Sequence, residues 1–150
     1  EMDCDFSHNP DDLLRLTAEL EAGADVAVGS RYSKGVTVVN WPMSRLLMSY
    51  CASRYVRIVT GMPVCDATAG FVGYKREVLA AIDFDRIEMV GYGFQIEMKY
   101  TAWKMGFRIG EVPIIFADRT EGTSKMSGGI FGEAFFGVLA LPFRTIARKK

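Results

Sequence analysis

The first apolar repeat in the chain lies between residues 9 and 23 and predicts an amphipathic helix. Asn9 is expected to cap its N-terminus, Pro10 to lie in its first turn and Gly23 to end it. The acids Asp11 and Asp12 suit the positive end of the helix dipole. The predicted buried face consists of Leu13, Leu14, Leu16, Ala18 and Leu20.

Strand-like and helix-like segments alternate along the rest of the chain, and this alternation predicts an α/β fold. Strands are expected at 25–30, 71–74 and 112–116, with Pro113 at a sheet edge. Helices are expected at 43–60 (ended by Gly61), 75–82, 93–105 and 130–147, the last interrupted at Pro142. Residues 35–42 are expected to form a loop.

The composition fits one globular domain. The chain has 150 residues, of which 49% are hydrophobic and 24% charged, with 18 acids balancing 18 bases. Zero net charge gives no general attraction to nucleic acid, and no stretch approaches the roughly 18 apolar residues of a membrane span. The three cysteines lack metal-ligand spacing, which favours free thiols in a reducing compartment. We therefore expect a cytoplasmic protein, either soluble or at a membrane surface.

The charges are unevenly distributed along the chain. Residues 1–25 hold eight acids and one base, whereas residues 26–65 hold five bases and no acid. Such a division suits a metal ion at one end of a site and anionic groups at the other. The alternative is a solvated surface with uneven charge.

The Asp3-Cys4-Asp5 segment is the first candidate for chemistry. Two carboxylates one residue apart in a loop can be directed at one divalent cation, and oxygen ligands favour Mg²⁺ or Mn²⁺ that also bridges to substrate phosphates. The alternative interpretation of this short pattern is an ordinary surface loop.

Six segments, in this order along the chain, support the hypothesis that Asp3 and Asp5 bind a metal ion. They are residues 2–10 (MDCDFSHNP), 29–32 (GSRY), 40–45 (NWPMSR), 66–71 (DATAGF), 91–98 (GYGFQIEM) and 119–126 (RTEGTSKM). Together they resemble the dolichol-phosphate (polyprenyl-phosphate) mannose synthases, a branch of the inverting family 2 glycosyltransferases with the Rossmann-like GT-A fold. The resemblance implies transfer of mannose from GDP-mannose to a polyprenyl phosphate, with Mg²⁺ or Mn²⁺, at the cytoplasmic membrane face.

The resemblance also implies roles for individual residues. Asp3 and Asp5 correspond to ligands of the metal and diphosphate, and Ser7 to a weaker, water-mediated ligand. Arg31 falls near the donor and acceptor phosphates, and Asp66 lines the sugar pocket. The pocket is closed by Gln95 and Glu97, and the acceptor phosphate is held by a loop with Arg119, Ser124 and Lys125. Asp5, Asp66, Arg119 and Lys125 would be the catalytic residues.

The expected mechanism is positioning combined with electrostatics. A phosphate monoester has a second pKa of about 6, so the acceptor is already a dianion at neutral pH and needs no general base. The only histidine, His8, is therefore not required. The metal would stabilise the leaving diphosphate, and Arg119 and Lys125 would align the acceptor for a displacement that inverts the anomeric carbon.

Several of these residues also have simpler interpretations. Taken without the rest of the pattern, Arg119 and Lys125 are better explained as ordinary loop charges, and Glu97 also suits a solvated helix position or an ion pair. Asp66 suits a turn or a cap, because Asp-Ala-Thr is favourable turn chemistry.

Two apolar helical segments, 43–60 and 130–148, are predicted to lie in a membrane interface. The first carries only arginines as charges, and the second leads into Arg148, Lys149 and Lys150. Core helices are the alternative.

In the family that the chain resembles, the Asp-x-Asp motif ends a central strand well inside the domain, whereas Asp3 lies close to the start of this chain; the resemblance therefore implies a partial GT-A domain. Residues 1–150 would supply the metal, sugar and acceptor side and lack the N-terminal nucleotide-binding half, so the isolated chain is expected to be inactive. An uncovered sheet edge would favour self-association. Two other functions remain open: a sister enzyme using UDP-glucose or another sugar nucleotide, and a non-catalytic membrane-associated domain that binds polyprenyl phosphate.

Overall fold

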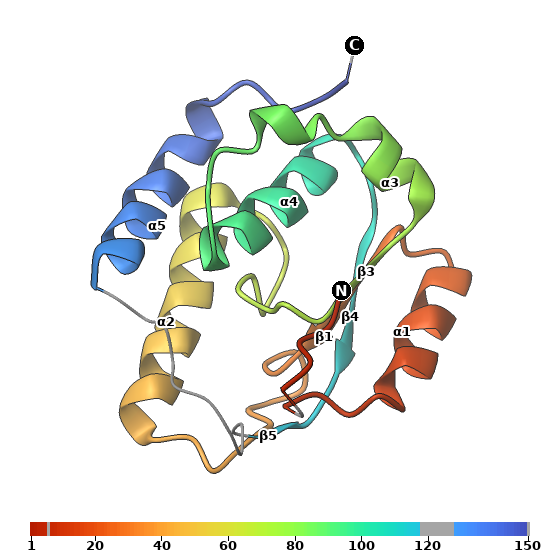
Figure 1. Cartoon of the computed structure of the whole chain (residues 1–150), viewed down its shortest axis with the longest axis vertical. Helices are drawn as coiled ribbons and strands as arrows, with labels where there is room; N and C mark the ends of the chain where they lie inside the picture. The colour runs from red at the N-terminus through yellow and green to blue at the C-terminus, as the bar shows by residue number, and fades with distance from the viewer. Residues whose placement is uncertain (6, 118–127, 150) are drawn as a thin grey trace.

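The computed structural model describes residues 1–5, 7–117 and 128–149 (Figure 1). The helices are α1 (Asp12–Glu21), α2 (Met43–Thr60), α3 (Arg76–Ala81), α4 (Tyr92–Lys104) and α5 (Gly128–Ala140), with the short 3₁₀ turns η1 (Phe84–Arg86) and η2 (Leu141–Phe143). The strands are β1 (Val26–Ser30), β2 (Val38–Val39), β3 (Val72–Tyr74), β4 (Ile109–Pro113) and β5 (Phe116–Ala117). The predicted α/β class is confirmed.

The central sheet has the order β3-β1-β4. Strand β1 pairs antiparallel with β3 and parallel with β4, and β2 and β5 form a separate two-stranded parallel sheet. All five residues of β1 are buried. The backbone of Glu1 exchanges hydrogen bonds with Val72 in β3, so the acidic first loop begins beside this sheet.

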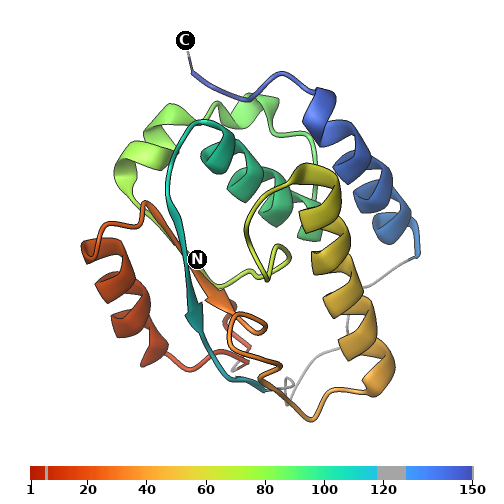
Figure 2. The ribbon, with the colours of Figure 1, turned by 180° about the vertical axis from the view of Figure 1, so that it is seen from behind.

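Successive residues of β1 pack on opposite faces, as the period of a strand requires. Val26 and Val28 pack in one cluster with Met98 of α4, whereas Ala27 packs in another with Leu16 of α1. Figures 1 and 2 show α1 on one side of the sheet and α4 on the other, with α2 and α5 beyond α4.

Helices α2 and α5 lie side by side. The rings of Tyr55 in α2 and Phe135 in α5 stack with centroids 4.7 Å apart, and the Tyr55 hydroxyl donates to the Phe135 carbonyl oxygen at 3.0 Å. Segments 80 residues apart in sequence therefore form one wall of the molecule.

Helix α2 has the predicted bounds, but its packing differs from the expected pattern. Gly61 ends it in the left-handed conformation, with φ at 72°. Leu47 and Ile58 were expected on the apolar face and are exposed by 55% and 79%. The buried positions of this helix are Ser53, Val56 and Thr60.

Helix α1 begins later than predicted. Asn9 does not cap it: the Asn9 side-chain oxygen accepts from the Asp11 amide in a turn that precedes the helix. Leu13 and Leu14 are exposed, because the sheet covers only the strip of the helix that contains Leu16.

The end of the chain also differs from its prediction. Helix α5 stops at Ala140, and Pro142 lies in the η2 turn that follows. The remaining residues run past the end of α3, where Arg148 forms a bridge with Ile82 and the backbone amide of Asp83 donates to the carbonyl of Ala147. The helix predicted to reach residue 147 is thus shorter. The strand β2, within the predicted 35–42 loop, was not predicted.

Replacing Gly29 with alanine is expected to lower the free energy of unfolding by about 1–3 kcal/mol. The added Cβ would lie 2.9 Å from Cδ1 of Phe71 and 3.2 Å from the Phe71 carbonyl oxygen, and this backbone is held by its pairing with β1. Urea unfolding measures the change. Gly132→Ala is the control, because a Cβ there meets open space, and it should be neutral or stabilising. Equal losses in both variants would contradict the packing.

Candidate functional site

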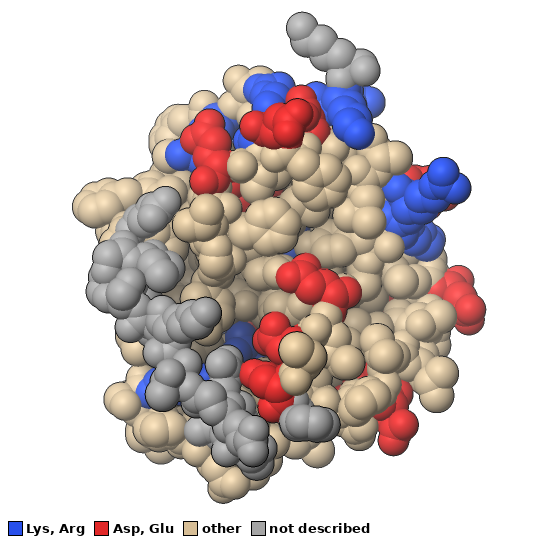
Figure 3. All heavy atoms as spheres, in the orientation of Figure 1, with Lys and Arg blue, Asp and Glu red and all other residues tan. Residues whose placement is uncertain are grey.

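The described residues line an open cavity of about 870 Å³. Its walls come from the acidic loop before α1, the end of β1, helices α2 and α5, the segment before β3 and the start of α4. Figure 3 shows a hollow with acidic side chains at its edge and basic atoms at its bottom. The cavity thus brings together segments that were singled out separately in the sequence.

Asp3 and Asp5 line the acidic side of this cavity. Ser7 is buried behind them: its hydroxyl donates to Oδ1 of Asp5 at 2.5 Å and its amide donates to the same oxygen at 3.1 Å. Ser7 is not among the residues that line the cavity, so it orients the Asp5 carboxylate instead of facing a ligand itself.

The two carboxylates fit a Mg²⁺ or Mn²⁺ ion. Such ions are commonly bound through one or two carboxylates, with water and substrate phosphate oxygens as the other ligands. No cluster of three or more histidine, cysteine or acidic side chains within metal-binding reach occurs among the described residues. The donor set therefore suits a metal that is shared with a substrate.

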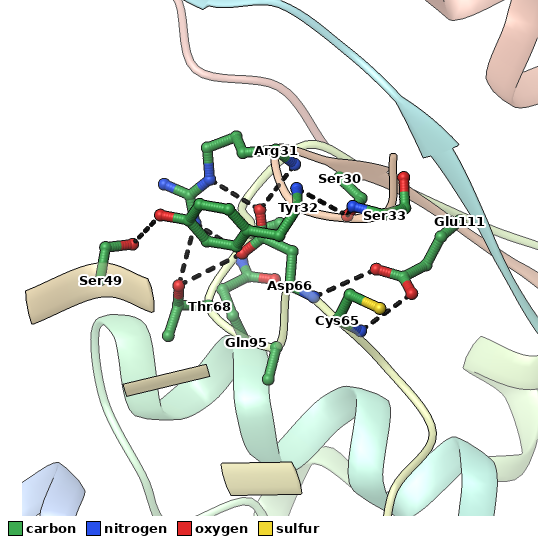
Figure 4. A network of polar contacts seen from close by, with 12 residues as sticks. Ser30, Arg31, Tyr32, Ser33, Ser49, Cys65, Asp66, Thr68, Gln95 and Glu111 are labelled. Carbon is green, nitrogen blue, oxygen red and sulfur yellow. Dashed lines mark hydrogen bonds and ion pairs between the residues drawn. The ribbon is translucent and has the colours of Figure 1, made fainter. Parts of the chain in front are cut away.

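Arg31 and Asp66 form a buried ion pair beside the cavity (Figure 4). Nε of Arg31 lies 2.7 Å from Oδ2 of Asp66 and Nη2 lies 2.6 Å from Oδ1, while the Arg31 amide also donates to Oδ2. Burial disfavours the charge, but the hydrogen bonds and charge of Asp66 outweigh it and raise the pKa of the Arg31 guanidinium. Arg31 lines the cavity and Asp66 does not. Asp66 was predicted to line the sugar pocket, but in the structure it holds Arg31 instead.

Aromatic rings surround the Arg31 guanidinium. Its central carbon lies 5.3 Å from the ring centre of Tyr32, 5.4 Å from that of Trp41 and 5.6 Å from that of Phe116. Arg45 of α2 contacts the same Trp41 ring: its central guanidinium carbon lies 4.2 Å from the ring centroid. Arg45 lines the cavity and was not predicted as a site residue, although it belongs to the NWPMSR segment.

Gln95 projects from α4 into the cavity wall. Its amide nitrogen donates to Oε1 of Glu1 at 2.6 Å, and its side-chain oxygen is buried with no hydrogen-bond partner among the described residues. The contact with Glu1 ties the start of α4 to the acidic first loop. The sugar-binding role of Gln95 stays a prediction.

Glu97 lies behind the cavity wall and is not among its lining residues. Its Oε2 accepts from the backbone amides of Glu88 at 3.0 Å and Met89 at 2.8 Å, and its Oε1 lies 3.7 Å from Nη1 of Arg144. Glu97 therefore fixes the segment that leads into α4, and a direct contact with sugar is not supported by this geometry.

Glu97→Gln is expected to destabilise the protein by about 1–3 kcal/mol, because charge-assisted bonds to two backbone amides are weakened and Arg144 loses its buried partner. Thermal or urea unfolding would measure the loss. Glu77→Gln, at an exposed position of α3, is the matched control and should change stability by less than about 0.5 kcal/mol. A Glu97 variant as stable as the control would show that these contacts contribute nothing.

Lys99 is a buried charge that sequence analysis did not single out. Its Nζ donates to the carbonyl oxygens of Ala67 at 3.1 Å, Ala69 at 2.7 Å and Gln95 at 3.1 Å, and the residue is fully buried. Burial, opposed chiefly by the charge of Asp66, lowers the pKa of the Lys99 ammonium to about 7. A lysine in a helix usually lies in solvent, so nothing in the sequence indicated this position.

His8 packs between the rings of Phe71 and Phe116, with centroids 4.9 Å and 5.0 Å away. Burial lowers the pKa of its imidazole, and the carboxylates of Asp3 and Asp5 oppose this shift. His8 is therefore neutral at neutral pH.

Three predicted residues, Arg119, Ser124 and Lys125, lie outside the described residues. Their roles stay predictions.

One part of the cavity is apolar. Its lining there comes from α2, α4 and α5 and includes Met48, Ala52, Ile96, Ala134 and Val138. Outside the cavity, the same region exposes Met43 and Leu47 of α2, Phe136 of α5 and Phe143 of η2. No helix in the described part of the chain combines the length and apolarity needed to cross a bilayer.

The sequence is similar to those of several curated proteins. The chain is 49% identical over 138 residues to a polyprenol monophosphomannose synthase of Mycolicibacterium smegmatis, which covers 92% of this chain and 52% of the relative. It is equally similar to an undecaprenyl-phosphate mannosyltransferase of Micrococcus luteus, over 92% of this chain and 56% of the relative. A dolichol-phosphate mannosyltransferase of Pyrococcus furiosus is 34% identical, over 85% of this chain and 35% of the relative.

The chain spans about half the length of the first two of these curated relatives. The family model described as glycosyl transferase family 2 matches residues 1–83, which is more than half of the chain. The α/β arrangement is consistent with part of the GT-A fold that the resemblance implied. The chain belongs to glycosyl transferase family 2.

Proposed function

We propose that this chain carries the metal, sugar and acceptor side of a glycosyltransferase that moves mannose from GDP-mannose to a polyprenyl phosphate with inversion. The observation that carries the proposal is one cavity with Asp3 and Asp5 on one side, Arg31 and Arg45 on another, and an apolar wall between α2 and α5. Those features suit, in turn, a metal-bound diphosphate, a phosphate anion and a hydrocarbon chain. The names of the relatives support the same substrate classes.

The residues of the chain would act by binding and orientation. Asp3 and Asp5 would hold Mg²⁺ or Mn²⁺, which stabilises the departing nucleoside diphosphate as a Lewis acid. Ser7 keeps the Asp5 carboxylate turned to the cavity. Gln95, which lines the cavity, would contact the sugar.

The acceptor phosphate would be bound by cationic side chains. Arg31 lies in the cavity wall with its guanidinium fixed by Asp66, so it is preorganised to bind an anion at little entropic cost. Arg119, Ser124 and Lys125 are proposed to complete the phosphate site. Because the acceptor is a dianion at neutral pH, no proton has to be removed, and a neutral His8 is compatible with the reaction.

A polyprenyl substrate requires contact with a membrane. The exposed apolar side chains on α2, α5 and η2 would lie in the interface, and Arg148 and Lys149 would attract anionic headgroups, each contributing roughly 1 kcal/mol. We place the protein at the cytoplasmic face of the membrane, as a peripheral enzyme.

A donor panel tests the proposal on the full-length protein as its source produces it. The enzyme is incubated with polyprenyl phosphate, Mn²⁺ and either GDP-mannose or UDP-glucose, and the lipid product is measured. Product from GDP-mannose alone supports the proposal. Product from UDP-glucose alone would favour the sister enzyme. Binding to polyprenyl-phosphate vesicles that neither Mn²⁺ nor GDP-mannose alters, without any product, would favour the non-catalytic domain.

The length of the active polypeptide needs a separate measurement. We propose that residues 1–150 alone do not transfer mannose, because the chain spans about half of the relatives that are named as synthases. The intact mass of the protein from its source, compared with 16.7 kDa, identifies the polypeptide to assay. Analytical ultracentrifugation of the isolated 150 residues tests the predicted self-association.

A further inference from the structure

Residues 65–69 link the cavity to two charged side chains that do not line it. Thr68 lies in the cavity wall, and its hydroxyl accepts from Nη2 of Arg31 at 2.9 Å. Asp66, two residues earlier, makes the bidentate pair with the same guanidinium. The orientation of Arg31 therefore depends on where the backbone of this segment lies.

Glu111 of β4 holds one end of the segment. Its Oε2 accepts from the amide of Cys65 at 2.8 Å and its Oε1 accepts from the amide of Asp66 at 3.1 Å. Figure 4 shows Glu111 reaching these two amides while the Asp66 side chain extends toward Arg31. One carboxylate thus fixes two successive amides next to the residue that binds the guanidinium.

Lys99 of α4 holds the other end of the segment. Its ammonium donates to the carbonyls of Ala67 and Ala69, which flank Thr68, and it also donates to Gln95 in its own helix. A buried ammonium is costly unless its hydrogens are all bonded, and here three carbonyl oxygens meet its three hydrogens. A methionine would fill similar space but would remove the donor from both carbonyls.

We propose that Lys99 and Glu111 are positioning residues for the transfer reaction: they fix residues 65–69 from opposite ends, so that Asp66 and Thr68 present the Arg31 guanidinium to the anionic substrate. This inference rests on the proposed function. Neither side chain contacts the cavity, so both act through Arg31 and neither is catalytic.

The test is a pair of double-mutant cycles in the full-length protein. Lys99→Met and Glu111→Gln are each made in the wild-type and in an Arg31→Gln background. In the wild type, kcat/KM for transfer from GDP-mannose should fall about 10- to 100-fold, with a higher KM for at least one phosphate-bearing substrate. In the Arg31→Gln background the same changes should cost less than about 2-fold, because residues that act through a shared partner are not additive.

Matched controls separate positioning from general destabilisation. Lys104→Met is at an exposed position of the same helix, and Glu77→Gln is exposed on α3, so both should keep wild-type kinetics. A merely structural role would lower the amount of folded enzyme, and hence the apparent kcat, while leaving KM unchanged. Equal losses in the wild-type and Arg31→Gln backgrounds, or an unchanged KM for both substrates, would overturn the proposal.

Two further measurements apply if a variant does not fold or if the wild type is inactive. If Lys99→Met does not fold, the cycle with Glu111→Gln decides. If the wild-type protein transfers no sugar, the proposed function fails, and the inference is judged by calorimetric binding of pyrophosphate with Mn²⁺. The affinity should then fall about 10-fold in Glu111→Gln, whereas adding Glu111→Gln to Arg31→Gln should lower it no further than Arg31→Gln alone does. Additive losses of affinity would refute the positioning role independently of catalysis.

Discussion

Asp5→Asn in the full-length protein is expected to reduce mannosyl transfer by about 1,000-fold or more, since a lost metal ligand removes several kcal/mol of stabilisation from the departing diphosphate. Asparagine keeps an Oδ1 atom that can accept both hydrogen bonds from Ser7, so the loop before α1 should retain its conformation. The loss would therefore reflect the missing charge and not a misfolded loop.

The measurement is initial rate against Mn²⁺ concentration for the wild type and the variant. The half-saturating Mn²⁺ concentration should rise in Asp5→Asn in addition to the fall in rate. Asp85→Asn, at an exposed position of η1, is the matched control and should behave as the wild type. More than about one tenth of wild-type activity in Asp5→Asn would contradict the metal assignment, because one lost ligand should cost far more.

Asp66→Asn is expected to lower the free energy of unfolding by about 3–5 kcal/mol, the usual cost of removing one partner of a buried ion pair. The Asp66 side chain is fully buried and the Arg31 side chain is 9% exposed, so the arginine would keep its charge without a neutralising partner. Transfer should also fall, since Arg31 would no longer be held by two parallel hydrogen bonds.

Urea unfolding of both Asp66→Asn and Asp12→Asn provides the comparison. Asp12 pairs with Arg15 at 2.6 Å, but the Arg15 side chain is 50% exposed, and such pairs contribute about 0.2–1 kcal/mol. If the two variants lost equal stability, the Arg31–Asp66 pair would have no special structural importance.

Much of the fold could be predicted from local patterns. Helix α2 has the predicted bounds of 43–60, because Pro42 precedes it and Gly61, in the left-handed conformation, ends it. Strand β1 was recognisable as a short apolar run. The predicted strand 112–116 is in fact the end of β4 and the first residue of β5, two strands in different sheets. Strand β2 has two residues, too few to carry a periodic signal, and it pairs with β5.

The sequence indicated which segments form the candidate site, but it did not indicate where all of their side chains point. The segments around Asp3, Arg31 and Gln95 meet at one cavity, as the resemblance implied. Asp66 and Glu97 belong to the same segments but hold Arg31 and the backbone before α4, respectively. A motif gives the residue type at a position, whereas the direction of its side chain depends on partners far away in sequence.

Lys99 and Glu111 illustrate the same limit more strongly. Lys99 contacts residues 30 and 32 positions earlier, and Glu111 contacts amides 45 and 46 positions earlier. Each looks like a solvated charge in its local sequence. Only the packing of α4 and β4 against residues 65–69 buries Lys99 and supplies the partners of both side chains.

The most direct test of the account is the product that the full-length protein forms from GDP-mannose and polyprenyl phosphate, with Mn²⁺ and after its removal by EDTA. The account predicts a mannosyl phosphoryl polyprenol with inverted, β, anomeric configuration, identified by mass spectrometry and NMR, that forms with Mn²⁺ and does not form after chelation. No mannolipid, an α-linked product, or equal product after chelation would contradict it.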